Sequence, residues 1–212
     1  MPDRILDPMD RISEVLFGLI MALTFTCTLG VAAAEVRTML IGALGCNLAW
    51  GIIDAIMYIM NSMVVRRSKM RLVQAVKRTS DPEKALRLVR NHVEPEFQDL
   101  LPRNEAEAFS KSVLKHITGA HIANRILTKE DFYGAAASFW LVFASCLPAA
   151  IPFLIFKEPQ VALRVSNFLL IASLFYVGQK WGDYAGKSRL AIGLAMVTVG
   201  LLLVGIAILL GG

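Results

Sequence analysis

The chain has 212 residues, of which 56% are hydrophobic and only 18% are charged, and its mean hydropathy is +0.56. Soluble domains of this size carry more charge and shorter apolar runs, so this composition excludes an ordinary soluble protein. A helix needs about 20 apolar residues to cross the roughly 30 Å hydrocarbon core of a bilayer. The sequence therefore predicts an all-α polytopic membrane protein with five transmembrane helices. The five predicted spans cover residues 15–34, 39–60, 133–156, 165–178 and 190–210.

The first predicted span follows a short segment of mixed charge. This segment lacks the features of a cleavable signal peptide, and the apolar run is too long for one, so we expect it to remain as a membrane helix. Glu14 stands at its start, and Met21 and Thr24 lie on or beside the helical face that continues from Glu14. A thioether and a hydroxyl can bind a transition metal, although hydroxyls in membrane helices often bond to their own backbone instead.

The second predicted span contains one acidic residue, Asp54, within an otherwise apolar stretch. An ionised carboxylate there costs several kcal/mol unless something compensates for its charge. Asn47, Gly51 and Asp54 lie along one stripe of a helix, and a polar stripe of this kind usually faces a partner helix or a hydrated pathway. Two interpretations remain open. Asp54 binds an ion or a proton, or it is a structural contact that is hydrogen-bonded to a neighbouring helix.

Residues 66–132 form a polar insert between the second and third spans. The insert holds fourteen Lys/Arg and nine Asp/Glu residues, so the whole net charge of +5 belongs to it. The positive-inside rule places it in the cytosol, which puts the N-terminus in the cytosol and, after five spans, the C-terminus outside. Asp81-Pro82 and Asn104 are typical starts of two short amphipathic helices. Their basic face either contacts anionic lipid headgroups or is solvated.

The sequence thus predicts three parts: an N-terminal segment with transmembrane helices 1–2 (1–65), the cytosolic helical insert (66–132) and transmembrane helices 3–5 (133–212). In the third span, Pro148 and Pro152 free backbone carbonyls and predict a kink. The sequence contains no nucleophile elbow, zinc motif or intact phosphate-binding loop. We therefore expect neither an enzyme nor a bound cofactor, and no nucleic-acid partner.

Several features, taken in order, resemble the vacuolar iron transporter family in a short prokaryote-like form. An Asp10-Arg11 pair leads into the first span, the second span begins with small residues and runs into a basic segment, and a helical insert follows. The third span carries Pro148 and Pro152, and a glycine-bounded apolar stretch closes the fifth. The matching stretches are VLFGL at 15–19, IGALG at 41–45 and GLLLVG at 200–205.

That resemblance implies a homodimer whose pathway lies between the protomers and is lined by their first and second spans. It implies export of ferrous iron, and often manganese, from the cytosol in exchange for protons, with glutamates of the cytosolic helices collecting the metal. Two features differ from the family. Met21 stands where the first-span aspartate is expected, the membrane carboxylate being Asp54 instead, and the insert has few glutamates, without a repeated E-x-x-E pattern.

We therefore expect the chain to export a divalent transition metal, iron or manganese, by proton exchange, as a homodimer in a bacterial inner membrane. Asp54 would hold the ion or the proton, with Asn47, Met21 and Thr24 near it and Glu14 at the cytosolic mouth. The alternative is a non-transporting membrane protein that keeps the same fold. In that case Asp54 is a structural contact and the basic insert binds lipid or a protein partner.

Overall fold

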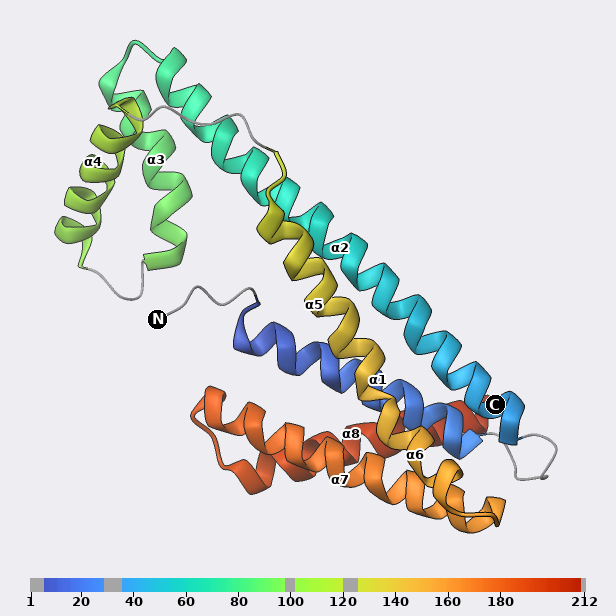
Figure 1. The fold of residues 1–212 in the computed structure, drawn as a ribbon. Helices are drawn as coiled ribbons and strands as arrows, with labels where there is room; N and C mark the ends of the chain where they lie inside the picture. The colour runs from blue at the N-terminus through green and yellow to red at the C-terminus, as the bar shows by residue number, and fades with distance from the viewer. Residues whose placement is uncertain (1–5, 29–35, 98–101, 120–125, 211–212) are drawn as a thin grey trace. The chain divides into compact units, whose positions relative to one another are not determined.

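The computed structural model describes residues 6–28, 36–97, 102–119 and 126–210, in which all regular structure is helical (Figure 1). The helices are α1 (Pro8–Thr28), α2 (Val36–Arg78), α3 (Pro82–Phe97), α4 (Arg103–Gly119), α5 (Lys129–Ser145), α6 (Leu147–Ile155), α7 (Pro159–Ala185) and α8 (Arg189–Leu209). The chain divides into two compact units. The first, which we call the membrane unit, comprises Met1–Ile59 and Lys129–Gly212, and the second, the insert unit, comprises Met60–Thr128.

Four helical stretches in the described part of the chain are long and apolar enough to cross a membrane, and they indicate an integral membrane protein. The prediction of five spans is not confirmed, because α1 is not among them. Asp10, Arg11 and Glu14 lie in its first two turns, and the predicted continuation to residue 34 falls outside the described residues. The four stretches are Leu40–Arg78, Lys129–Ile155, Pro159–Ala185 and Arg189–Leu209.

Helix α1 is the centre of the membrane unit. It packs against α5, α7 and α8, and one buried cluster joins it to α6, α7 and α8. Because other helices cover much of its surface, α1 needs less apolar surface than a helix that faces lipid. The cluster consists of Leu16, Leu19, Ala22 and Leu23 from α1 with Cys146, Ala149, Leu170, Leu174 and Val204.

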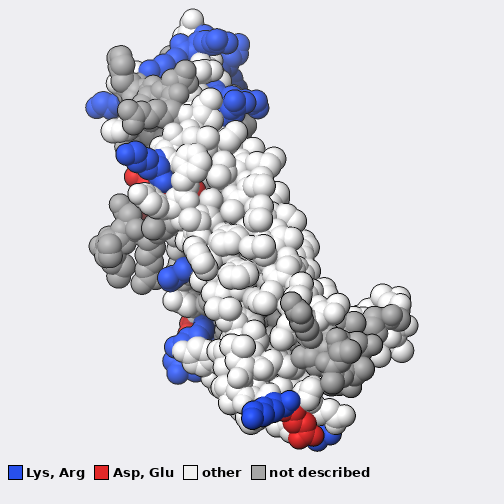
Figure 2. Space-filling view, turned by 45° about the vertical axis from the view of Figure 1, so that its right-hand side comes forward, with Lys and Arg blue, Asp and Glu red and all other residues white. Residues whose placement is uncertain are grey.

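Helix α2 contrasts with α1, because many of its large apolar side chains are exposed. Ile52, Ile53, Ile56 and Met57 are each between 45% and 59% exposed. Figure 2 shows one face of the membrane unit, on which uncharged atoms cover a broad continuous area. Surface of this extent needs lipid or another protein to cover it.

The third predicted span is interrupted at Cys146, between α5 and α6. Pro148 follows at the start of α6, where it lacks the N–H that would continue the helical hydrogen bonds of α5. Near the interruption, Ser145 Oγ donates to the Val142 carbonyl at 2.6 Å, and Ser166 Oγ of α7 donates to the Ala149 carbonyl of α6 at 2.8 Å. The two prolines predict a kink in the third span, and the helix is interrupted beside the first of them.

Helices α7 and α8 form a tight antiparallel hairpin (Figure 1). Gly186 ends α7 in the left-handed conformation, with φ of 63°, which other residues adopt only under strain. The N–H groups of Gly186 and Lys187 both donate to the Gly182 carbonyl, and Ser188 caps the start of α8. Helix α7, at Pro159–Ala185, extends beyond both ends of the predicted span 165–178.

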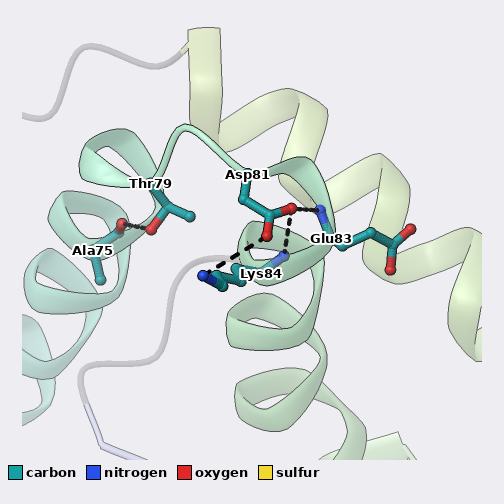
Figure 3. A network of polar contacts seen from close by, with 5 residues as sticks. All are labelled: Ala75, Thr79, Asp81, Glu83 and Lys84. Atoms are coloured by element: carbon teal, nitrogen blue, oxygen red, sulfur yellow. Dashed lines mark hydrogen bonds and ion pairs between the residues drawn. The ribbon is translucent and has the colours of Figure 1, made fainter.

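The insert unit has a small apolar core of its own. Val76, Ala85 and Val89 are buried, and side chains of α4, Val113, Leu114 and Ile117, pack against them. Figure 3 shows how α3 begins: Asp81 Oδ1 accepts the N–H of Glu83 at 3.0 Å and that of Lys84 at 3.4 Å. This is the cap that the Asp81-Pro82 pair predicts. In Figure 2, Lys and Arg side chains gather over this unit.

The observed division differs slightly from the predicted one. The sequence placed the insert at 66–132 because charged residues begin at Arg66, whereas the packing places it at Met60–Thr128. Pro95 lies within the last turn of α3, which extends to Phe97.

Candidate functional site between α1, α2 and α5

Helices α1 and α2 run antiparallel in the membrane unit, and the two polar stripes predicted from the sequence face each other. Residue numbers rise along α1 as they fall along α2, as expected for an antiparallel pair. Because both stripes lie on this one interface, their polar groups meet inside the unit and away from lipid. The paired positions are Glu14 with Asp54, Gly18 with Asn47, Met21 with Cys46 and Phe25 with Gly42.

A pair of carboxyl groups, Glu14 and Asp54, lies at one end of this interface. The two side chains are half-buried and close enough to share a hydrogen bond when one of them is protonated. Ser138 of α5, only 1% exposed, donates from its Oγ to Glu14 Oε1 at 2.8 Å. Glu14 Oε2 is buried and has no hydrogen-bond donor within the described residues. Two ionised carboxylates this close repel each other, so a proton or a cation between them stabilises the arrangement.

Asn47 lies seven residues, or about 10 Å along α2, from Asp54. It is fully buried, and its Nδ2 donates to the Ala43 carbonyl at 3.1 Å. Its Oδ1 accepts no hydrogen bond from any residue that the structure describes. A buried amide oxygen without a donor costs free energy, and it is a suitable ligand for water or a cation.

At Gly18, α1 lies close to both α5 and α2. A methyl group on Gly18 would lie 1.8 Å from Ser145 Oγ, 2.6 Å from the Val142 carbonyl and 3.0 Å from Asn47 Oδ1. Helix α2 also contacts α5 directly, since a methyl group on Gly51 would lie 2.9 Å from the ring of Phe139. Each of the three helices is therefore in contact with the other two beside the polar groups.

Met21 and Thr24, also predicted as site residues, lie farther along α1 from the carboxyl pair. The thiol of Cys46 donates to Met21 Sδ at 3.1 Å, and Thr24 Oγ1 donates to the Ile20 carbonyl of its own helix at 2.9 Å. Met21 is seven residues from Glu14, about 10 Å along the helix. The structure thus brings Glu14 and Asp54 together but does not place Met21 or Thr24 beside them.

The sequence analysis missed two buried serines, Ser138 and Ser145 of α5. They are seven residues apart, the same spacing as Asn47 and Asp54, and such a spacing puts both on one face of a helix. The seven-residue spacing of the two serines within an otherwise apolar span was the feature of the sequence that could have identified them. It was insufficient because a serine in a membrane helix can bond to its own backbone, as Ser145 does with Val142.

The arrangement offers oxygen atoms rather than a complete metal centre. Among the described residues there is no group of three or more His, Cys, Asp and Glu side chains that could hold a metal ion. A divalent cation at the carboxyl pair would therefore complete its coordination with hydroxyl or amide oxygens or with water.

These features define a class of protein: an integral membrane protein with a half-buried carboxyl pair between its helices. No protein-family model matches the chain, and no curated protein matches its sequence. The resemblance to the vacuolar iron transporter family therefore rests on the sequence pattern alone and remains a hypothesis.

Proposed function

We propose that the protein is a membrane transporter that exports a divalent transition metal, iron or manganese, from the cytosol in exchange for protons. The observation that carries this proposal is the Glu14–Asp54 pair, with the buried oxygens Glu14 Oε2 and Asn47 Oδ1 unpartnered in the described structure. Buried ionisable groups in membrane segments are costly and are kept mainly where ions or protons pass.

In this proposal, protons and the metal ion compete for the same two carboxyl groups. Deprotonation of Glu14 and Asp54 creates a site of charge −2 that attracts a divalent cation, and reprotonation releases the cation. Ser138 holds one oxygen of Glu14 in place and leaves the other available. The amide oxygen of Asn47 is the next ligand along the α1–α2 interface.

We further propose that α1 is a fifth span, which places the N-terminus in the cytosol and the C-terminus outside. Its packing supports this, because α1 contacts three of the apolar helices of the membrane unit. The positive charge of the insert supports a cytosolic position for it. A cysteine replacing Ser80 should then react with an impermeant thiol reagent only from the cytosolic side of a bacterial inner membrane.

A homodimer is part of the same proposal. The exposed apolar face of α2 includes two small residues, Gly45 and Ala49, and nothing lies within 4 Å of a methyl group added at Gly45. Small residues allow two membrane helices to approach closely. Cysteines at these two positions should therefore crosslink between protomers, and their failure to do so in lipid would rule out a dimer through α2.

A second candidate function is a non-transporting membrane protein that keeps this fold. The lack of a three-residue metal cluster within the described chain favours it. In this case the carboxyl pair, with one proton, would be a structural contact between α1 and α2, and the basic insert would bind lipid or a partner.

Metal flux in proteoliposomes under an imposed pH gradient separates the two candidates. We expect wild-type protein to move Fe²⁺ or Mn²⁺, Asp54→Asn to insert normally but lose the flux, and Asp54→Glu to keep part of it. Glu158→Gln is the matched control, because this exposed carboxylate precedes α7 and lies outside the site. Full flux in Asp54→Asn, or none in the wild type with either metal, would overturn the transporter proposal.

A further inference from the structure

A second feature of the membrane unit, separate from the carboxyl pair, is a groove between α1 and α7. It contains two cavities, of about 420 Å³ and 260 Å³, and Val15 and Val177 line both of them. The groove lies on a different face of α1 from the stripe that carries Glu14 and Gly18. The larger cavity is within the size range of sites for small ligands.

The larger cavity carries no charge. Its walls are mainly hydrocarbon, from Leu19 of α1, Pro148 of α6 and Leu169 of α7, with the small residues Ala172 and Ser173 along α7. A site of this kind favours an apolar chain, because each methylene group removed from water contributes about 0.8 kcal/mol.

The smaller cavity has two cations at its edge, Arg11 of α1 and Lys180 of α7, together with Tyr184. Lys180 Nζ lies 5.5 Å from the ring centroid of Tyr176, which lines the larger cavity. This contact holds the ammonium group where the two cavities adjoin. The nearest carboxylate along α7, Asp183, forms an ion pair with Arg189. The groove thus has an apolar end and a positively charged end.

We propose that this groove binds one anionic phospholipid. Its phosphate lies against Arg11 and Lys180, and one acyl chain occupies the larger cavity. The two cations lie near the start of α1 and the end of α7, which the positive-inside rule puts at the cytosolic surface, where anionic headgroups are abundant. The inference does not depend on transport, since the groove shares neither carboxyl group of the proposed metal site.

Native mass spectrometry of the full chain in mild detergent tests the proposal. Dioleoyl phosphatidylglycerol and dioleoyl phosphatidylcholine have the same chains and differ in net charge. We expect one phosphatidylglycerol to be retained, with at least about tenfold higher affinity than phosphatidylcholine. Because each cation contributes about 1 kcal/mol to binding of anionic lipid, Arg11→Gln with Lys180→Gln should weaken phosphatidylglycerol binding about 30-fold.

The matched control removes the same charge at the other end of α7. Lys157→Gln with Arg164→Gln, both exposed positions, should leave phosphatidylglycerol binding unchanged. Ala172→Phe, also exposed, should fill the larger cavity and weaken both lipids. The single variant Lys180→Gln, an exposed surface change, provides the same comparison if the double variant is poorly produced. Equal affinity for the two lipids, an equal loss in the control, or displacement of the lipid by inorganic phosphate alone would overturn the proposal.

Discussion

Both units of this protein bury apolar side chains, but they differ in the side chains that they expose. In the membrane unit, Asn47 and Ser138 are buried while Ile52 and Ile56 of α2 are exposed. In the insert unit, Val76 and Val89 are buried, and the charged side chains Glu107 and Lys111 are exposed. Both arrangements follow from one rule, that each side chain is placed according to the medium outside it.

This contrast explains why the same residue type has different consequences in each unit. A carboxylate in the insert pairs with a neighbouring lysine in water, where such pairs contribute little to stability. Glu14 and Asp54 are half-buried between helices of the membrane unit, where less water reaches a carboxylate, so a hydroxyl donor, a proton or a cation stabilises them. The function proposed for Glu14 and Asp54 follows from that stabilisation.

The largest expected effect concerns the carboxyl pair. If Glu14 and Asp54 act as one site, Glu14→Gln and Asp54→Asn should each reduce metal flux about 100-fold or more, and the double variant should be no worse than either single one. Flux in matched proteoliposomes provides the measurement. Losses that multiply in the double variant would show two independent sites.

A charge placed inside the insert should have the next largest effect. Val89 is 0% exposed, so Val89→Asp buries an unpaired carboxylate and should destabilise the insert by more than about 3 kcal/mol. Leu88→Asp, one residue away and 37% exposed, is the matched control and should change stability by less than about 1 kcal/mol. Amide hydrogen exchange of α3 and α4 measures both. Similar protection in the two variants would contradict the packing described here.

Helix contact in the membrane unit can be tested with two glycines. Gly18→Ala places a methyl group 1.8 Å from Ser145 Oγ and should destabilise the unit by about 1–3 kcal/mol. Gly205→Ala, within α8, meets nothing within 4 Å and should stabilise its helix by about 0.5–1 kcal/mol. Denaturant unfolding in mild detergent compares them. Equal stability of the two variants would mean that α1 and α5 are not in contact at Gly18.

The smallest expected effect concerns the exposed pair in the insert. Glu107 accepts a hydrogen bond from Lys111 at 2.7 Å, and this bond and the lysine charge lower the pKa of Glu107 below its ordinary value. The pair therefore contributes stability above that ordinary pKa, and the contribution is lost as the pH falls through the lowered one.

A carboxyl titration by NMR checks this. Lys111→Gln should return the pKa of Glu107 to its ordinary range, whereas Lys115→Gln, two helical turns away from Glu107, should leave it lowered. Neither change should alter the unfolding transition measurably, because both groups of the pair are fully exposed. If the pKa of Glu107 stayed lowered in Lys111→Gln, a group other than Lys111 would have to cause the shift.

Much of the fold could be predicted because it depends on local composition. Hydropathy located four of the membrane helices, and Asp81-Pro82 located the start of α3. The stripe through Glu14 and Met21 and the stripe through Asn47 and Asp54 could also be recognised, since each depends only on helical spacing. The fifth predicted span, at α1, is not confirmed, because a hydropathy average cannot distinguish a helix that other helices surround from one too polar to cross a membrane.

The sequence by itself determined which segments are apolar, which carry the positive charge and which polar residues share a helical face, because each property belongs to a short stretch of chain. The tertiary structure alone decided which of those faces meet. Glu14 contacts Ser138, 124 residues away, and the partner of Asp54 is Glu14 and not Met21 or Thr24. Contacts of this kind depend on how closely helices pack at positions such as Gly18, and no local pattern records that distance.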